Sequence, residues 1–299
     1  MTNAKQHNRQ ETILAYILIL PVLLLVLILF LYPTLFNFYI AVHEWNWSIP
    51  LDVPKPFIGF ENFSNLFTSS RFWNSFKISL LFVVFALVIE YFLGLALALT
   101  LNREFKGRGI FRAIFILPMM LAPIIIGIQW RYLLSGNFGA LNSLIELFGV
   151  QGPLWLSDPK WGLPILIAVD TWTYAPFVAL IILAGLQQIP QDLYDAAKVD
   201  GATPIKQFLY ITFPFLKPAT ALVLLLRAGE IFRAFDVVYV MTGGGPVRTT
   251  EVLGLYLYKI AFVQGDLGLA AAIGLIIAAV GMILGTLIAN LIRTEVRLF

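Results

Sequence analysis

The sequence of 299 residues contains no cysteine and only two histidines, His7 and His43. Thiol chemistry is therefore excluded, and neither a transition-metal site nor a Ser-His hydrolase can be assembled from so few ligands. No Gly-Lys dipeptide occurs, so a phosphate-binding loop of the Gly-x-x-x-x-Gly-Lys type is missing. We expect no metal, no cofactor and no catalytic residue. Any nucleotide that drives this protein must be bound by another polypeptide.

Charged residues are scarce as well. They make up 12% of the chain, while 60% is hydrophobic, whereas a soluble domain is about one quarter charged and about half apolar. This excess of apolar surface indicates an integral membrane protein. The net charge is only +3 and comes from scattered loop residues, so a nucleic-acid partner is not expected.

Six stretches are apolar and long enough to cross about 30 Å of hydrocarbon. They lie near residues 13–38, 76–101, 111–133, 162–186, 216–240 and 267–292. The first is too long for a signal peptide and lacks a cleavage pattern, so we expect it to be retained. Prolines fall inside the third stretch (Pro118, Pro123) and the fourth (Pro164, Pro176), where they predict bends. We expect a short polar tail, residues 1–11, and one transmembrane domain, residues 12–299.

The distribution of lysine and arginine predicts the orientation, because cytoplasmic loops hold these residues in excess. With both termini inside, the inner segments hold eleven lysines and arginines and the outer loops hold five. The expected fold class is therefore an all-α integral membrane protein with six transmembrane helices and both termini in the cytoplasm. Residues 102–110 and 187–215 would then be cytoplasmic, and 42–72, 135–160 and 241–266 would face outward.

The stretch between the fourth and fifth apolar runs, residues 187–215, differs from the other loops. Pro190 suits the first turn of a short helix, and Gly201 suits the left-handed position that ends it. Thr203 can cap a second helix with Pro204 at its first position. We therefore expect a cytoplasmic pair of short helices between helices 4 and 5.

The first of these helices places two alanines on an exposed face, where another protein surface can approach closely. The stretch resembles the EAA loop of binding-protein-dependent ABC importer permeases. That loop reads Glu-Ala-Ala, then Asp-Gly-Ala three residues later, then a proline about ten residues on. The matching residues are Asp195, Ala196, Ala197, Asp200, Gly201, Ala202 and Pro214. The departure is Asp195 in place of glutamate, which keeps the charge and shortens its reach.

Three further phrases narrow the resemblance to the carbohydrate-uptake, maltose-permease-like group. They are Phe-Ile-Gly-Phe-Glu-Asn-Phe at 57–63, Lys-Gly-Arg-Gly-Ile-Phe-Arg at 106–112 and Thr-Gly-Gly-Gly-Pro at 242–246. The resemblance implies a permease subunit in a bacterial or archaeal plasma membrane. Its implied partners are a second homologous permease, two ATPase subunits, an extracytoplasmic sugar-binding protein and a sugar. It also implies that the EAA loop couples the path to the ATPase.

Two sets of side chains are candidates for the substrate path. Arg227, Glu230, Arg233 and Asp236 recur every three residues in the fifth apolar run, where charge is expensive unless it meets water or a partner. Asp170, Trp172, Tyr174 and Phe177 combine aromatic rings with a carboxylate in the fourth run, as sugar sites do. We take Asp170, Trp172, Tyr174, Phe177, Arg227 and Glu230 as the predicted path. Ion pairs that brace the helix, and ordinary aromatic packing, explain the same residues. Glu90 has no identifiable partner.

Two other functions compete with this reading. An ion-coupled secondary transporter would also use buried carboxylates, but it predicts inverted repeats and broken helices, and the sequence indicates neither. A membrane enzyme would need a site made of carboxylates alone. The sequence does not say which sugar is carried, or whether it is neutral or anionic.

Overall fold

The computed structural model describes residues 16–50 and 52–296, with side chains as far as residue 290. The described chain is helical throughout its regular structure, and its only extended pairings are two isolated bridges. It divides into two compact units, residues 1–68 with 259–275 and residues 69–258 with 276–299. The polar tail predicted at residues 1–11 lies outside the described residues.

The first unit holds a continuous helix over Tyr16–Ala41, made of an opening α-helical stretch, a π-helical turn η1 (Leu27–Leu31) and α2 (Tyr32–Ala41). It also holds α3 (Glu61–Thr68), η4 (Lys259–Gln264) and the start of α14 (Leu267–Val296). Asn62 is buried, and its amide donates to the Ala41 carbonyl at 2.8 Å. The asparagine of the phrase at 57–63 thus holds the end of α2.

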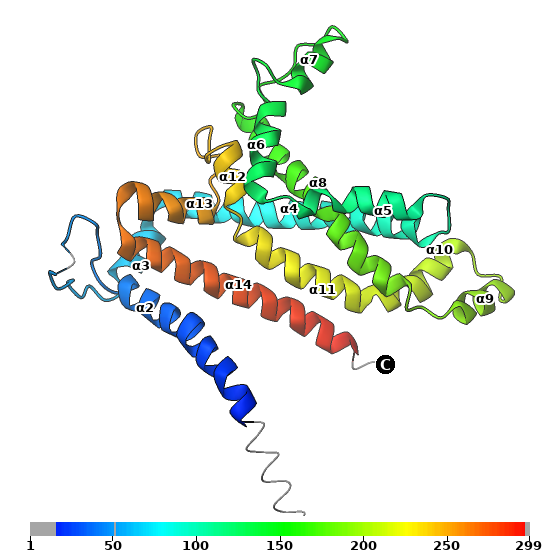
Figure 1. Ribbon diagram of the computed structural model, residues 1–299, viewed down its shortest axis with the longest axis horizontal. Helices are drawn as coiled ribbons and strands as arrows, with labels where there is room; N and C mark the ends of the chain where they lie inside the picture. Colours follow the sequence, from blue (N-terminus) through cyan, green and yellow to red (C-terminus); the bar gives the residue numbers. More distant parts are fainter. Residues whose placement is uncertain (1–15, 51, 297–299) are drawn as a thin grey trace, which may run out of the picture. The chain divides into compact units, whose positions relative to one another are not determined.

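The second unit is built on three long helices: α4 (Ser70–Asn102), α8 (Pro159–Leu186) and α11 (Phe213–Phe232). In Figure 1, α8 lies along α4, and α11 packs against both. The approach of α4 to α8 is close, because a Cβ on Gly94 would lie 2.5 Å from the Val178 side chain. A hydrogen bond of 2.9 Å between Tyr91 and Thr220 joins α4 to α11.

Shorter helices complete the second unit. They are α5 (Arg108–Ile116), η2 (Pro118–Met120), α6 (Pro123–Leu133), α7 (Ala140–Glu146), α9 (Gln191–Val199), α10 (Pro204–Gln207), η3 (Phe208–Thr212), α12 (Asp236–Met241) and α13 (Leu253–Tyr258). In Figure 1, α6 and α7 project away from the long helices of this unit.

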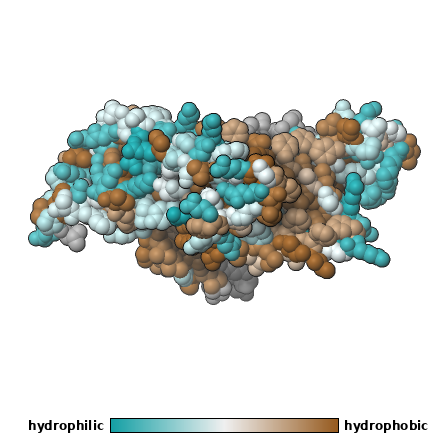
Figure 2. All heavy atoms as spheres, turned by 90° about the horizontal axis from the view of Figure 1, so that it is seen from above, coloured by the Kyte–Doolittle hydropathy of each residue, from teal (hydrophilic) through white to brown (hydrophobic). Residues whose placement is uncertain are grey.

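Five described helices are long and apolar enough to cross a membrane, or six if one bent pair counts as a single span. They are Tyr16–Ala41, Ser70–Asn102, Pro159–Leu186, Pro204–Phe232 and Leu267–Asn290, and the bent pair is Arg108–Met120 with Pro123–Leu133. Figure 2 shows apolar side chains gathered right of the centre of this face, next to an end that mixes hydrophilic and apolar side chains, where α9 and α10 lie in Figure 1. The predicted first, second, fourth and sixth stretches match these helices within a few residues at most boundaries. The third and fifth stretches differ.

The bend that the prolines predict in the third stretch is confirmed, and it interrupts the helix, because 111–133 is divided between helical segments on either side of residues 121–122. The chain bends by 96° between Met120 and Pro123. Leu121 and Ala122 adopt extended backbone conformations. Ala122 directly precedes Pro123, and helical geometry is disfavoured for a residue before proline. A broken helix, which the sequence did not indicate, is therefore present.

The boundaries of the fifth stretch also differ from the prediction. The helix begins at Pro204 and ends at Phe232, and residues 233–235 separate it from α12. The second short helix expected in the cytoplasmic loop is therefore the first part of the long helix. Arg227 and Glu230 lie in its last two turns. Arg233 and Asp236 lie beyond its end, so the run of four charges is not on one helix.

Candidate functional site

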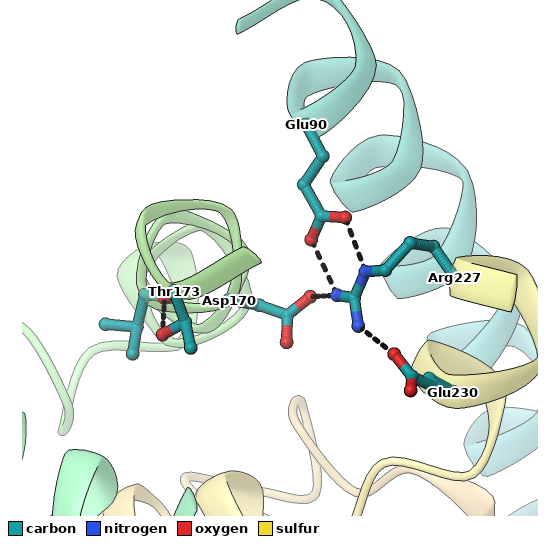
Figure 3. Close-up of polar contacts among 6 residues, drawn as sticks. Glu90, Asp170, Thr173, Arg227 and Glu230 are labelled. Carbon is teal, nitrogen blue, oxygen red and sulfur yellow. Dashed lines mark hydrogen bonds and ion pairs between the residues drawn. The ribbon is translucent and has the colours of Figure 1, made fainter. Parts of the chain in front are cut away.

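A cluster of ion pairs joins the three long helices of the second unit. Arg227 on α11 donates from Nε and Nη2 to the two carboxylate oxygens of Glu90 on α4, both at 2.8 Å. Its Nη2 also donates to Asp170 on α8 at 2.8 Å, and its Nη1 donates to Glu230 at 2.6 Å. Figure 3 shows the three carboxylates converging on the guanidinium. A planar fork with two parallel N–H donors suits this bidentate contact with Glu90.

The cluster runs from the protein interior to the surface. The side chains of Glu90 and Arg227 are 0% and 1% exposed, Asp170 is 11% exposed, and Glu230 is 53% exposed. A buried charge in a bilayer is unfavourable unless it is paired and hydrogen-bonded. Arg227 satisfies that condition for Glu90 and Asp170, while Glu230 carries the cluster to the exposed face of α11.

Tyr174 completes the surroundings of Arg227. It lies one turn after Asp170 on α8, and its ring centroid is 3.8 Å from the Arg227 guanidinium carbon. A cation over an aromatic face is stabilised by the ring quadrupole. The side of α8 that carries Asp170 and Tyr174 therefore faces α11.

Four of the six predicted path residues meet here: Asp170, Tyr174, Arg227 and Glu230. Trp172 does not, because it lies on the other side of α8, with its ring 5.5 Å from that of Trp130. Phe177 is half-buried.

Glu90 belongs to the cluster, so the statement that it lacks an identifiable partner is corrected. Its partner lies 137 positions away in the sequence. The available signal was that the apolar run 78–102 contains Glu90 as its only charged residue, as 218–229 contains Arg227.

Two cavities lie elsewhere in the second unit. One of about 670 Å³ is mostly apolar and is bounded by α4, α5 and α8, with Trp172 in its wall. Thr171 also lines it, and the buried Thr171 hydroxyl has no hydrogen-bond partner. The other, of about 750 Å³, is bounded by α6, the 134–138 and 154–157 segments and the end of α12. Neither wall includes Asp170 or Glu230.

Helices α6 and α12, which follow the breaks in the third and fifth apolar stretches, pack against each other. Arg131 on α6 donates to the Val240 carbonyl at 3.0 Å. Gly127 permits close approach, because a Cβ there would lie 3.1 Å from Val240. The two helix ends beyond the breaks at 121–122 and 233–235 therefore pack on each other.

The segment that carries the EAA resemblance forms an exposed helix, α9, which has no fully buried residue. It ends in a Schellman motif: Gly201 has φ +74°, its N–H donates to the Lys198 carbonyl, and the Ala202 N–H donates to the Ala197 carbonyl at 2.8 Å. The local predictions for Gly201 and for Thr203 are confirmed, since the Thr203 hydroxyl accepts from the Lys206 N–H.

Two further contacts fix α9. Tyr194 shares a hydrogen bond of 2.8 Å with Thr212 in η3, directly before the turn that contains Pro214. Asp195 pairs with Lys198 at 2.9 Å. The Lys198 ammonium and the Gln191 amide hold the pKa of Asp195 below its ordinary range, so Asp195 is ionised at neutral pH. Asp195 and Ala196 remain exposed on the surface of α9, and Asp200 lies exposed at its end.

Comparison with known proteins gives three findings. The family model described as "Binding-protein-dependent transport system inner membrane component" matches residues 90–297. The trehalose/maltose transport system permease protein MalF of Thermococcus litoralis is 37% identical over 267 residues, which cover 89% of each protein. The sulfoquinovosyl glycerol transport system permease protein SmoG of Agrobacterium fabrum is 32% identical over 95% of this chain and 92% of its own length.

Among solved structures, one chain of a bacterial ABC transporter involved in the import of the acidic polysaccharide alginate has a TM-score of 0.83 and 26% identity. The match covers 97% of this chain and 99% of that chain. The arrangement of helices, the EAA-like segment and these matches agree. The chain belongs to the family of inner membrane components of binding-protein-dependent transport systems.

Proposed function

We propose that this chain is the permease subunit of an ATP-driven sugar importer and forms half of the translocation path. The observation that carries the proposal is the family match over residues 90–297, which spans both the charged cluster and α9. MalF of Thermococcus litoralis, similar along 89% of this chain, is named for trehalose and maltose transport. A sugar is therefore the substrate class that we propose.

The partners follow from the same family. A second homologous permease would complete the path, two ATPase subunits would hydrolyse ATP, and an extracytoplasmic binding protein would deliver the sugar. A solved relative with 24% identity is in complex with a periplasmic protein that holds an alginate pentasaccharide. We place the six spans with both termini in the cytoplasm, so that α9 lies on the ATPase side.

We propose α9 as the contact with the ATPase. Its Asp195 and Ala196 are exposed, and small side chains let another surface approach closely. Tyr194 ties α9 to η3, and the helix continues without interruption from Pro204 to Phe232. A displacement of α9 would therefore reach Arg227 and Glu230 at the far end of one rigid element.

The substrate path, in this proposal, follows the face of α8 and α11 at Asp170, Tyr174 and Glu230, with Arg227 holding the carboxylates in place. Tyr174 supplies an aromatic face, and the exposed Glu230 supplies an acceptor for sugar hydroxyls. Phe177, two turns after Asp170, extends the same side of α8. Trp172 lines the apolar cavity on the other side of α8, so we propose that it contacts substrate there and not beside Tyr174.

A secondary transporter is the alternative. The broken helix at 121–122 is a feature it would share. The family to which the chain belongs is defined by binding-protein-dependent transport, and this is the observation that favours the ATP-driven function.

Cysteine cross-linking tests the proposal, because the native chain contains no cysteine. Ala196→Cys on α9 should form a cross-link to a co-expressed ATPase subunit through a short reagent that joins this thiol to a lysine amine of the ATPase. Leu287→Cys on α14, also exposed, is the matched control and should not. A tagged chain that purifies without an ATPase and cross-links at neither position would refute the proposed function.

A further inference from the structure

The excess of carboxylates in the charged cluster bears on which class of substrate can pass it. Three carboxylates surround one guanidinium, so that acidic groups outnumber basic groups by two. Resting on the proposed function, we infer that the path at this depth is negative, that it carries neutral sugars, and that it discriminates against phosphorylated, sulfonated or carboxylated ones. Glu230 is the specificity-determining residue.

Arg227 is the residue that would attract an anionic sugar, but four of its five N–H donors are occupied. A guanidinium has five N–H groups. One on Nε and two on Nη2 bind Glu90 and Asp170, and one on Nη1 binds Glu230. The side chain is also 1% exposed. An anion could reach this arginine only by displacing a carboxylate that is already in place.

The neighbouring charges do not reverse the sign. Arg233, one turn after Glu230, donates to the Gly229 carbonyl at the end of α11. With Arg233 included, carboxylates still outnumber guanidinium groups, three to two. Lys and Arg side chains are absent from α11 between Lys217 and Arg227. An approaching anion therefore meets net repulsion on this face.

The exposed face of α11 is otherwise apolar near the cluster. Leu222, Leu226 and Glu230 succeed one another at intervals of four residues, and all three are exposed. Glu230 is the only group among them that can accept hydrogen bonds from sugar hydroxyls. A carboxylate there favours polyhydroxylated neutral molecules and disfavours molecules that carry their own negative charge.

The field can be measured without knowing the substrate. Leu226→Cys introduces the only thiol of the chain, one turn from Glu230. It is treated, in the assembled transporter, with methanethiosulfonates that carry either a trimethylammonium or a sulfonate group. The same thiolate attacks both reagents, forms a mixed disulfide and releases methanesulfinate. The ratio of the two rates, divided by the ratio for a free thiol, therefore reports the local potential alone.

We expect the cationic reagent to be favoured about tenfold, as for an excess negative charge several ångströms away in a partly hydrated site. Adding Glu230→Gln should reduce the preference about threefold, and Glu230→Lys should reverse it. Arg233→Gln is the matched change of opposite sign and should strengthen it. Leu222→Cys, one turn further away, should show a smaller preference.

Two results would overturn the inference. One is a normalised ratio at or below one, which would mean that the face is not negative. The other is no reaction with either reagent, which would mean that the face is dry. A transporter that shows the expected ratio but imports neither labelled maltose nor labelled trehalose with its binding protein and ATP would instead count against the proposed function.

Discussion

Removing the arginine at the centre of the cluster should be far more damaging than removing any one of its carboxylates. Arg227→Met leaves Glu90, which is 0% exposed, without its counter-charge, while Asp170 and Glu230 lose theirs. Glu90→Gln leaves Arg227 paired with two carboxylates and lowers the excess of negative charge. The two substitutions therefore change the balance of charge in opposite directions.

The size of the effect follows from the burial. Breaking a buried ion pair by removing one partner costs about 3–5 kcal/mol. We expect Arg227→Met to fall in that range and Glu90→Gln to cost about 1–2 kcal/mol, the cost of weakened hydrogen bonds. Combining Arg227→Met with Glu90→Met removes both residues of the pair. This double variant should therefore lose about 2 kcal/mol less stability than the sum of the losses in the single variants Arg227→Met and Glu90→Met.

Thermal unfolding of the detergent-solubilised transporter, followed by tryptophan fluorescence, measures the differences. The midpoint for Arg227→Met should fall by an amount on the order of 10 °C. Arg233→Met is the matched control, since it removes the same residue type from the exposed end of the same helix, and it should change the midpoint little. Equal shifts for Arg227→Met and Arg233→Met, or a strictly additive double variant, would refute the reasoning.

Three further predictions concern packing and turns. Gly201 has positive φ, and a Cβ at this position meets no other atom, so a substitution there acts through backbone strain alone. Gly201→Val should cost about 1–2 kcal/mol and uncouple ATP hydrolysis from uptake, whereas Gly201→Asn, which tolerates that conformation, should remain coupled. Equal coupling in the two variants would contradict the prediction. Gly94→Ala should lower the free energy of unfolding by about 1–3 kcal/mol because the added methyl group pushes α4 away from α8. Val178→Ala should restore part of this loss. Gly281→Ala, with open space around its Cβ, should be neutral in the same unfolding assay. Asn142→Ala should remove the 2.6 Å bond from Trp155 and two carbonyl contacts, so that chymotrypsin cleaves residues 135–157 faster while α4 and α8 stay protected.

Much of the helical layout could be predicted because its signals are local. An uninterrupted apolar run reports a long helix in lipid, and Gly201, Thr203 and Pro204 each act within a few residues of the chain. The bend before Pro123 also had a local signal, since Ala122 precedes a proline, but the apolar run continued through it. Length and hydropathy alone do not distinguish a straight span from a broken one.

The remaining features depend on contacts between distant residues. Nothing local ends the helix at Phe232. Its continuation, α12, packs instead on α6, through Val240, Gly127 and Arg131. Glu90 and Arg227 are joined only when α4 and α11 come together. Trp172 was grouped with Tyr174 because both are aromatic, although positions two apart on a helix point in different directions.

We propose that this chain carries sugar at the expense of ATP hydrolysed by a partner. The most direct test is uptake of labelled maltose or trehalose into proteoliposomes that contain the chain with its second permease, ATPase and binding protein. Uptake that requires ATP and the binding protein, and that is unchanged when ionophores collapse the proton and sodium gradients, is the predicted result. Uptake by the chain without the ATPase, driven by an imposed ion gradient and abolished by the same ionophores, would show that the chain is a secondary transporter and not part of an ATP-driven importer.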